Sequence, residues 1–220
     1  MTEYLPWLAL ALLGGFHGVN PGMGWLFAVA LGLQERSRAA VLRAFGPIAL
    51  GHAASVALVV ALVAAVQVWI APGGLRALGA GVLVAFGLYK LLVPLSHPRW
   101  VGMRVGARDL MVWSFLMATA HGAGLMLVPV LLDLPVADAY AAADAHADHA
   151  LMMTTPGALT WAELAAVGLH TAAMYLVMGA IALVVFEKVG VAIVRRAWFN
   201  LDRVWAGALI AAGMGTLIFR

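Results

Sequence analysis

The sequence has no cysteine among its 220 residues. This excludes disulfides, thiolate metal ligands and cysteine nucleophiles together. The sequence also lacks a phosphate-binding P-loop, a zinc-protease motif and a Ser-His-Asp set, which are the motifs of the commonest hydrolases. We therefore expect a protein that is not an enzyme.

Charged residues are scarce as well, at 10% of the chain against about 25% in a soluble domain. Hydrophobic residues make up 65%, in runs that reach the roughly 20 residues needed to cross a bilayer core. The sequence predicts an all-α integral membrane protein without a separate soluble domain. A secretory signal peptide is the competing interpretation of the N-terminus, but Met1-Thr2-Glu3 lacks the basic residues typical of one. The expected spans are residues 4–33, 40–69, 74–94, 108–133, 160–187 and 199–219.

Lysine and arginine are distributed unevenly between the predicted loops. Eleven of the thirteen lie after the first, third or fifth span, and only Arg76 and Arg220 lie on the other side. Because basic residues favour cytoplasmic loops, we expect a multi-pass cell-membrane protein with both termini outside. This distribution explains the basic charge balance, so nucleic acid is not an expected partner.

The two halves of the sequence carry similar motifs in the same order. Phe16-His17-Gly18 in the first span matches Ala120-His121-Gly122 in the fourth. His52 in the second span matches His170 in the fifth, and glycines align between the third and sixth spans. We therefore expect two three-helix repeats, residues 1–107 with a cytoplasmic linker and residues 108–220 with an external loop at about 134–160. Because each half has three spans, the second must enter the membrane from the opposite side, as an inverted repeat.

The repeat pairs four histidines, each about ten to twelve residues into its span: His17, His52, His121 and His170. At 1.5 Å per residue, that depth is about 15–18 Å, the middle of the bilayer core. Ionisable residues there usually face the bundle interior or a wet cavity. Imidazole binds Ni, Co, Cu and Zn and also titrates near neutral pH. The four histidines are therefore candidates for a shared metal site, for a proton relay, or for packing and interhelical hydrogen bonds.

Methionines accompany two of these histidines. Met117 and Met126 lie about one turn before and after His121, and Met174 follows His170 at i+4 on the same helix face. Thioether combined with imidazole suits Cu(I), but methionine is also ordinary filler in apolar helices. The three methionines are therefore auxiliary candidates for metal binding.

The predicted external loop contains a second group of candidate ligands. His146 and His149 alternate there with Asp144 and Asp148, and two methionines follow. The loop could collect a metal ion before entry or receive one on exit, or it could be a solvated acidic segment.

Asn20-Pro21-Gly22 interrupts the first span just beyond His17. Proline removes a backbone donor and glycine loosens the turn, so the helix should break here. A break at membrane depth is tolerated where it is buried in protein or lines a cavity. We expect Asn20, Pro21 and Gly22 to border the substrate path, with a functionless kink as the alternative. The fourth span contains Pro129 but no matching Asn-Pro-Gly.

The broken Asn20-Pro21-Gly22, the basic turn after it and the glycine-rich second and third spans resemble the lysine-exporter (LysE) superfamily. The resemblance covers most of the chain. It implies an exporter of amino acids, cadmium, or nickel and cobalt, with Asn20-Pro21-Gly22 near the transport path. The sequence departs at Met23, where amino-acid exporters usually have a second proline, and it lacks the His-Asp pair of the nickel and cobalt branch. The paired histidines fit the metal exporters better than the amino-acid exporters.

Together these features favour a transporter that moves a transition-metal ion through a midplane histidine site. The alternatives are a proton-coupled exporter of an amino acid or small metabolite, and a membrane-embedded redox protein whose histidines ligate haem or a metal. The expected partners are the lipid bilayer and a metal ion or small solute. The sequence leaves open the ion, the direction of transport, the coupling ion and whether the chain forms a homo-oligomer.

Overall fold

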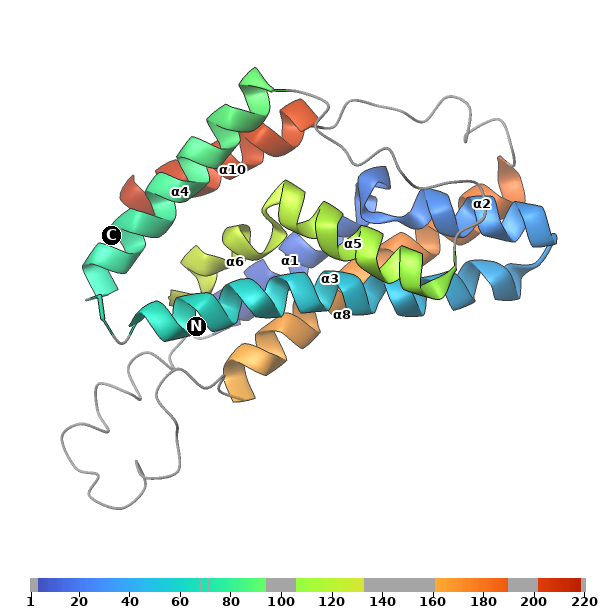
Figure 1. The fold of residues 1–220 in the computed structure, drawn as a ribbon, viewed down its shortest axis with the longest axis horizontal. Coiled ribbons are helices and arrows are strands. Elements are labelled where there is room, and N and C mark those ends of the chain that lie inside the picture. The colour runs from blue at the N-terminus through green and yellow to red at the C-terminus, as the bar shows by residue number, and fades with distance from the viewer. Residues whose placement is uncertain are drawn as a thin grey trace, which may run out of the picture.

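The computed structural model describes residues 4–67, 69–70, 72–93, 106–132, 161–189 and 202–218. Within these ranges the chain is built from helices and contains no strand, which confirms the all-α prediction (Figure 1). The helical elements are α1 (Leu5–Val19), the 3-10 turn η2 (Pro21–Met23), α2 (Trp25–Glu35), α3 (Arg38–Gln67), α4 (Pro72–Leu92), α5 (Ala107–His121), α6 (Ala123–Leu132), α8 (Trp161–Lys188) and α10 (Asp202–Ile218). His146 and His149 lie outside the described residues.

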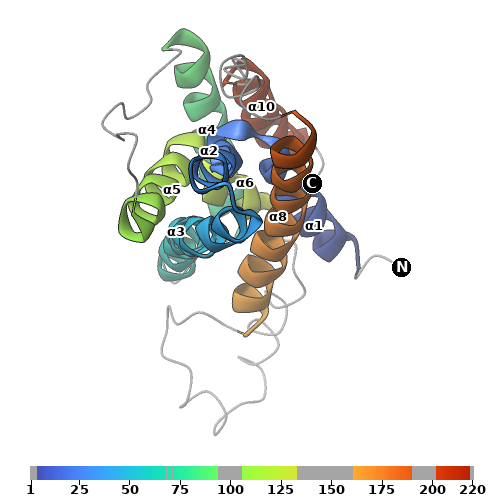
Figure 2. The same cartoon turned by 90° about the vertical axis from the view of Figure 1, so that its right-hand side faces the viewer.

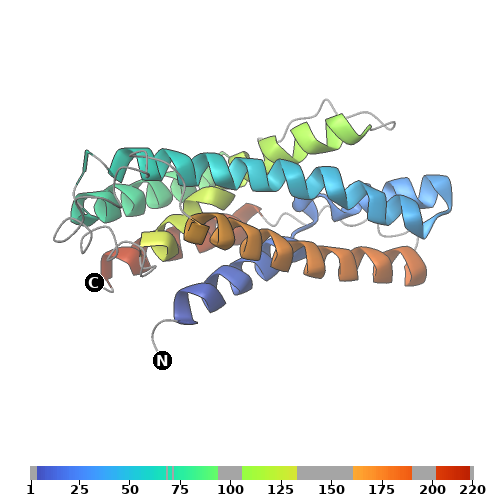
Figure 3. The same cartoon turned by 90° about the horizontal axis from the view of Figure 1, so that it is seen from below.

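Three of these helices, α3, α4 and α8, are long and apolar enough to cross a membrane. The pair α5 and α6, bent by 59° at its junction, brings the number to four if the pair is one span. Figure 3 shows α3 running along most of the length of the molecule, with α8 beside it over part of that length. The helices α1, α2 and α10 are apolar but shorter. Six spans were expected, the first of them broken at Asn20-Pro21-Gly22, and the three or four helices that are long enough in the described residues do not confirm that number.

The first predicted span breaks at the position that the sequence indicates. The Asn20 side chain accepts a hydrogen bond from the Gly22 N–H at 2.9 Å and so caps the short turn η2. Gly24 ends that turn with φ at 119°, a left-handed conformation that glycine adopts without a steric penalty. The Trp25 indole N–H donates to the Val19 carbonyl, a group left without its helical partner by the break. From there α2 continues toward the end of the molecule opposite the N-terminus (Figure 1).

The fourth predicted span is also broken, at a place that the sequence comparison missed. The helix α5 ends at His121, Gly122 adopts φ of 70°, and α6 begins at Ala123. Pro129 lies inside α6 and does not make the break. The glycine directly after the histidine was the available signal, since a left-handed glycine commonly ends a helix. Both halves of the chain therefore break within a few residues of a paired histidine.

Three helix pairs make the most extensive contacts: α1 with α8, α3 with α5, and α4 with α10. Close approach in the first pair requires Gly14, because a Cβ there would lie 2.2 Å from the His170 carbonyl oxygen. The second pair requires Gly51 in the same way, against the Met111 carbonyl. Viewed along the long axis, α4 and α10 lie together on one side of the other helices (Figure 2).

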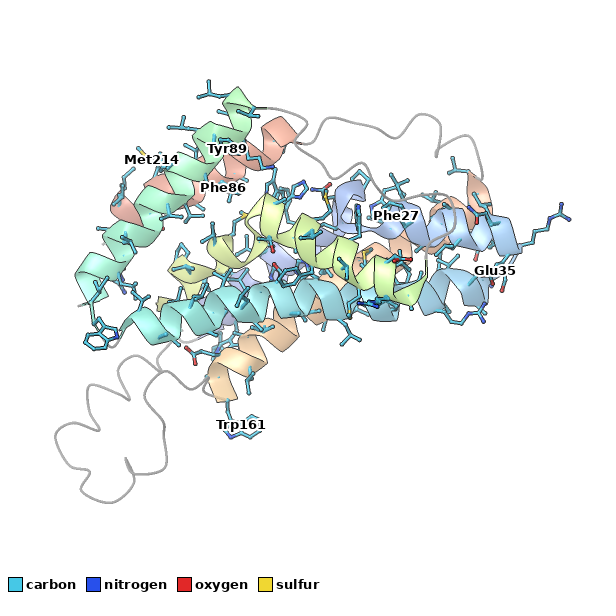
Figure 4. All side chains as sticks on the ribbon, viewed as in Figure 1. Phe27, Glu35, Phe86, Tyr89, Trp161 and Met214 are labelled. Carbon is cyan, nitrogen blue, oxygen red and sulfur yellow. The ribbon has the colours of Figure 1, made fainter. Side chains whose placement is uncertain are left out.

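The surface of the bundle suits a bilayer along its length and water at one end. Exposed leucines line the outer faces of the two longest helices, for example Leu50, Leu58 and Leu62 on α3. At the end where α2 meets α3, ion pairs join Arg43 to Glu35 at 2.7 Å and Arg38 to a glutamate of α8 at 2.5 Å. Figure 4 shows Glu35 at this end and Trp161 projecting near the other.

Candidate functional site

Three helices contribute one histidine each to a cluster of buried imidazoles: His17 of α1, His52 of α3 and His170 of α8. The ring centroids of His17 and His170 are 4.8 Å apart, those of His17 and His52 are 5.6 Å apart, and those of His52 and His170 are 5.5 Å apart. None of the three side chains is more than 1% exposed. The structure therefore brings together three of the four histidines that the sequence paired. We call His17, His52 and His170 the histidine cluster.

Hydrogen bonds to the backbone set the tautomer of two rings in this cluster. The Nδ1 atom of His17 lies 2.7 Å from the Leu13 carbonyl oxygen, and that of His170 lies 3.3 Å from the Leu10 carbonyl oxygen. A carbonyl oxygen can only accept, so each Nδ1 must donate its hydrogen. In the neutral ring, Nε2 then carries the lone pair, which is the form that binds a metal ion.

The Nε2 atoms of the histidine cluster share an unusual environment. In His17, His52 and His170 this atom is buried and has no hydrogen-bond partner. A buried polar atom without a partner costs about 1–3 kcal/mol, and most proteins avoid it. Three such atoms on adjacent rings make the histidine cluster the candidate site for a ligand.

The spacing of the rings can be compared with that of a metal site. If three imidazoles bind one ion through Nε2 at about 2.0–2.1 Å with tetrahedral angles, their centroids lie about 5 Å apart. The observed separations of 4.8 to 5.6 Å agree with that value. In the described part of the chain, however, no group of three or more His, Cys, Asp or Glu side chains is placed to hold a metal ion. Binding would therefore require the three nitrogens to converge through movement of the helices that carry the rings.

His121 lies beside the cluster, next to Trp205 of α10. The Trp205 ring is 4.4 Å from the His17 ring and 6.0 Å from the His121 ring, measured between centroids. Its indole N–H donates to the His121 carbonyl oxygen, the last of α5 before the break. The sequence places His121 in the same site as the other three, whereas the structure connects it to them through an indole ring.

Trp205 is a site residue that the sequence comparison overlooked. The similarity between the two halves of the sequence aligns the helix of Trp205 with the third span through glycines alone. A tryptophan within an apolar helix was the available signal, because a buried indole N–H needs an acceptor. In the structure Trp205 also stacks on Phe16, with 5.1 Å between ring centroids. It thereby connects the α4–α10 pair to the histidine cluster.

The residues of the first break lie close to His121. A Cβ built on Gly22 would be 3.7 Å from the Nε2 atom of His121, so the glycine leaves space in front of that ring. Asn20 is buried, and its side-chain oxygen is used in capping η2. Pro21 begins η2 directly after it. The breaks of the two halves thus meet at one level of the bundle.

The auxiliary methionines are all buried, in two different environments. Met126 packs with Trp205 and its neighbours between α6 and α10, and Met117 lies in α5 one turn before His121. Met174 lies one turn beyond His170 and packs, with Met178, in the apolar core between α2, α3 and α8. The structure places them as core residues near the histidines.

Charge is nearly absent from the interior around the cluster. Among the described residues, no aspartate or glutamate is buried, and the buried polar or charged side chains are His17, Asn20, His52, Ser55, Lys90, Ser114, His121 and His170. Lys90 of α4 lies 5.9 Å from the centroid of the Phe86 ring. The histidine cluster therefore has no buried acidic counter-charge in this part of the chain.

No protein-family model, curated protein or solved structure matches the chain. Fold and site together define an all-α protein with several helices able to span a membrane and a buried histidine cluster between three of its helices. Its function has to be argued from that cluster, because an architecture of this kind serves many functions.

Proposed function

We propose that this protein is a membrane transporter that moves a transition-metal ion through His17, His52 and His170. The observation that carries the proposal is the set of three buried Nε2 atoms without a partner. Neutral imidazole is a common ligand of Ni, Co, Cu and Zn, and two of the rings are held with Nε2 free to bind. Because the three rings come from different helices, small movements between those helices would assemble or disperse the site.

The proposed architecture has six spans: α1 with α2, α3, α4, α5 with α6, α8, and α10. Two observations support two inverted halves. First, His17 and His121 each donate from Nδ1 to the carbonyl four residues earlier, and each precedes a break by at most a few residues. Second, the helix contacts follow the pairing of the two halves. If each helix is replaced by its counterpart in the other half, the α1–α8 contact becomes the α5–α3 contact, and the α4–α10 contact stays the same. Inverted repeats of this kind usually hold the substrate at the interface between the halves.

The proposed orientation places both termini outside the cell membrane. One end of the bundle, where α2 and α8 end and α3 begins, carries Arg36, Arg38, Arg43 and Lys188. This end would face the cytoplasm. The end that holds the beginning of α1 and the turn between α3 and α4 would face outward (Figure 1). The likeness to the lysine-exporter superfamily is part of this proposal and agrees with export from the basic side.

The test is metal transport by purified protein in liposomes. His17→Asn, His52→Asn and His170→Asn should each reduce metal flux at least tenfold, because each removes one of three ligands. Ser114→Ala is the matched control: this buried hydroxyl donates to the Ile48 carbonyl at 2.7 Å, outside the cluster. The control should keep its flux at a similar cost in stability. Wild-type flux in all three asparagine variants would refute the proposal.

A proton-coupled exporter of a small metabolite is the second candidate. The observed positions of the three imidazole rings favour this function, because the rings contact one another but do not surround a common point. Under this function the purified protein would bind no metal ion. The asparagine variants would then change the dependence of solute export on the proton gradient.

A further inference from the structure

We infer that the cargo of the histidine cluster is a soft monovalent cation, with Cu(I) as the physiological form and Ag(I) as its redox-inert equivalent. This inference rests on the proposed transport function and specifies its substrate. It is drawn from what surrounds the three rings, since imidazole alone accepts many transition metals.

The charge of an ion determines how well the cluster can hold it. Moving an ion from water into a poorly polarisable interior costs free energy that grows with the square of its charge, so a divalent ion pays about four times as much as a monovalent ion of equal radius. Divalent sites usually offset this cost with carboxylates or thiolates. The chain has no cysteine, and the described residues include no buried aspartate or glutamate. Three neutral imidazoles can solvate one positive charge far better than two.

Two buried methionines follow the cluster on α8. His170, Met174 and Met178 follow one another at i, i+4 and i+8 on one face of α8, and none of the three is measurably exposed. This face packs on α1, where a Cβ on Gly18 would lie 2.5 Å from the Met174 carbonyl. Thioether sulfur binds Cu(I) and Ag(I) and is a poor ligand for hard divalent ions. The methionines extend from the histidine cluster toward the basic end of the bundle, from which exported cargo would enter.

The experiment is a competition between Ag(I) and Zn(II) for the purified protein, with bound metal measured by elemental analysis after equilibrium dialysis. The same competition for free imidazole in the same buffer gives the intrinsic preference of the ligand. We expect the protein to favour Ag(I) over Zn(II) at least tenfold more strongly than free imidazole does. His17→Asn should reduce Ag(I) binding at least tenfold, and Met214→Leu, at an exposed methionine of α10 (Figure 4), should not change it.

A designed carboxylate tests the charge argument separately. Ser55 is buried one turn from His52 on α3, so Ser55→Asp would add the missing counter-charge, and Ser55→Asn would change the shape equally without charge. The ratio of bound Zn(II) to bound Ag(I) should rise at least tenfold in Ser55→Asp and should stay at the wild-type value in Ser55→Asn. If the wild-type protein favoured Zn(II) over Ag(I) as strongly as free imidazole does, or more strongly, the monovalent inference would be overturned and the proposed function would stand. Absence of binding by either ion would overturn both.

Discussion

The contact between α1 and α8 makes a quantitative prediction, because it positions His17 against His170. Replacing Gly14 by alanine would put a Cβ 2.2 Å from the His170 carbonyl oxygen and 3.0 Å from the Ala173 Cβ. An ordinary contact to a carbonyl oxygen is longer by about 1 Å, and a backbone atom cannot rotate away. The two helices must therefore separate by about that distance, which also separates rings whose centroids are now 4.8 Å apart.

The expected cost follows from two opposing effects. Overpacking of a close contact costs about 1–3 kcal/mol, while alanine gains up to about 1 kcal/mol over glycine within a helix. With the full gain subtracted, Gly14→Ala should lower the free energy of unfolding by up to about 2 kcal/mol and weaken metal binding at the same time. Gly168→Ala on α8 is the matched control, because a Cβ there meets no atom within 4 Å. This control should be unchanged or stabilised by up to about 1 kcal/mol.

The assay is denaturant unfolding in detergent, followed by tryptophan fluorescence, with metal affinity measured on the same samples. The free energy of unfolding should fall in Gly14→Ala and should not fall in Gly168→Ala. If Gly14→Ala were as stable as Gly168→Ala and bound metal normally, α1 and α8 would not pack as described.

Three further predictions concern the surroundings of the site. Trp205→Phe keeps a ring but removes the donor to the His121 carbonyl, so it should cost about 1–3 kcal/mol of stability in the same unfolding assay; an unchanged variant would contradict the role of the indole N–H. A reporter enzyme fused to the C-terminus should be active on the outer side of the membrane, and a cytoplasmic signal would refute the six-span proposal. Replacing His146 and His149 together should change the half-saturating metal concentration more than the maximal rate; complete loss of transport would show that the loop holds the essential site.

The helical class, the first break and the convergence of three histidines were accessible from the sequence for physical reasons. Long apolar runs specify helices in lipid, and Asn20-Pro21-Gly22 removes the backbone bonds that continue a helix. His17, His52 and His170 were expected at a similar depth, and ionisable side chains at that depth usually face the bundle interior, where they can meet. Their use as metal ligands stays a proposal, since convergence does not by itself identify a ligand.

The position of His121 and the second break were less accessible. A single glycine after a histidine is a weak signal, because glycine is frequent in this chain and only some glycines adopt a left-handed conformation. The Trp205 side chain contacts the rings of both His17 and His121, and it comes from a helix more than eighty residues beyond His121 in the sequence. Depth along a helix also says nothing about rotation around its axis. Sequence position alone therefore could not show that these two histidines would share an indole neighbour.

The central claim is that three imidazoles bind the cargo together, and X-ray absorption spectroscopy of the metal-loaded protein tests it most directly. The ion that the purified protein binds most tightly should show about three imidazole ligands, at about 2.0–2.1 Å for a zinc-like ion. The imidazole signal should fall in a variant that carries His17→Asn, His52→Asn and His170→Asn. A spectrum with one imidazole or none, or one that this triple variant leaves unchanged, would contradict the account.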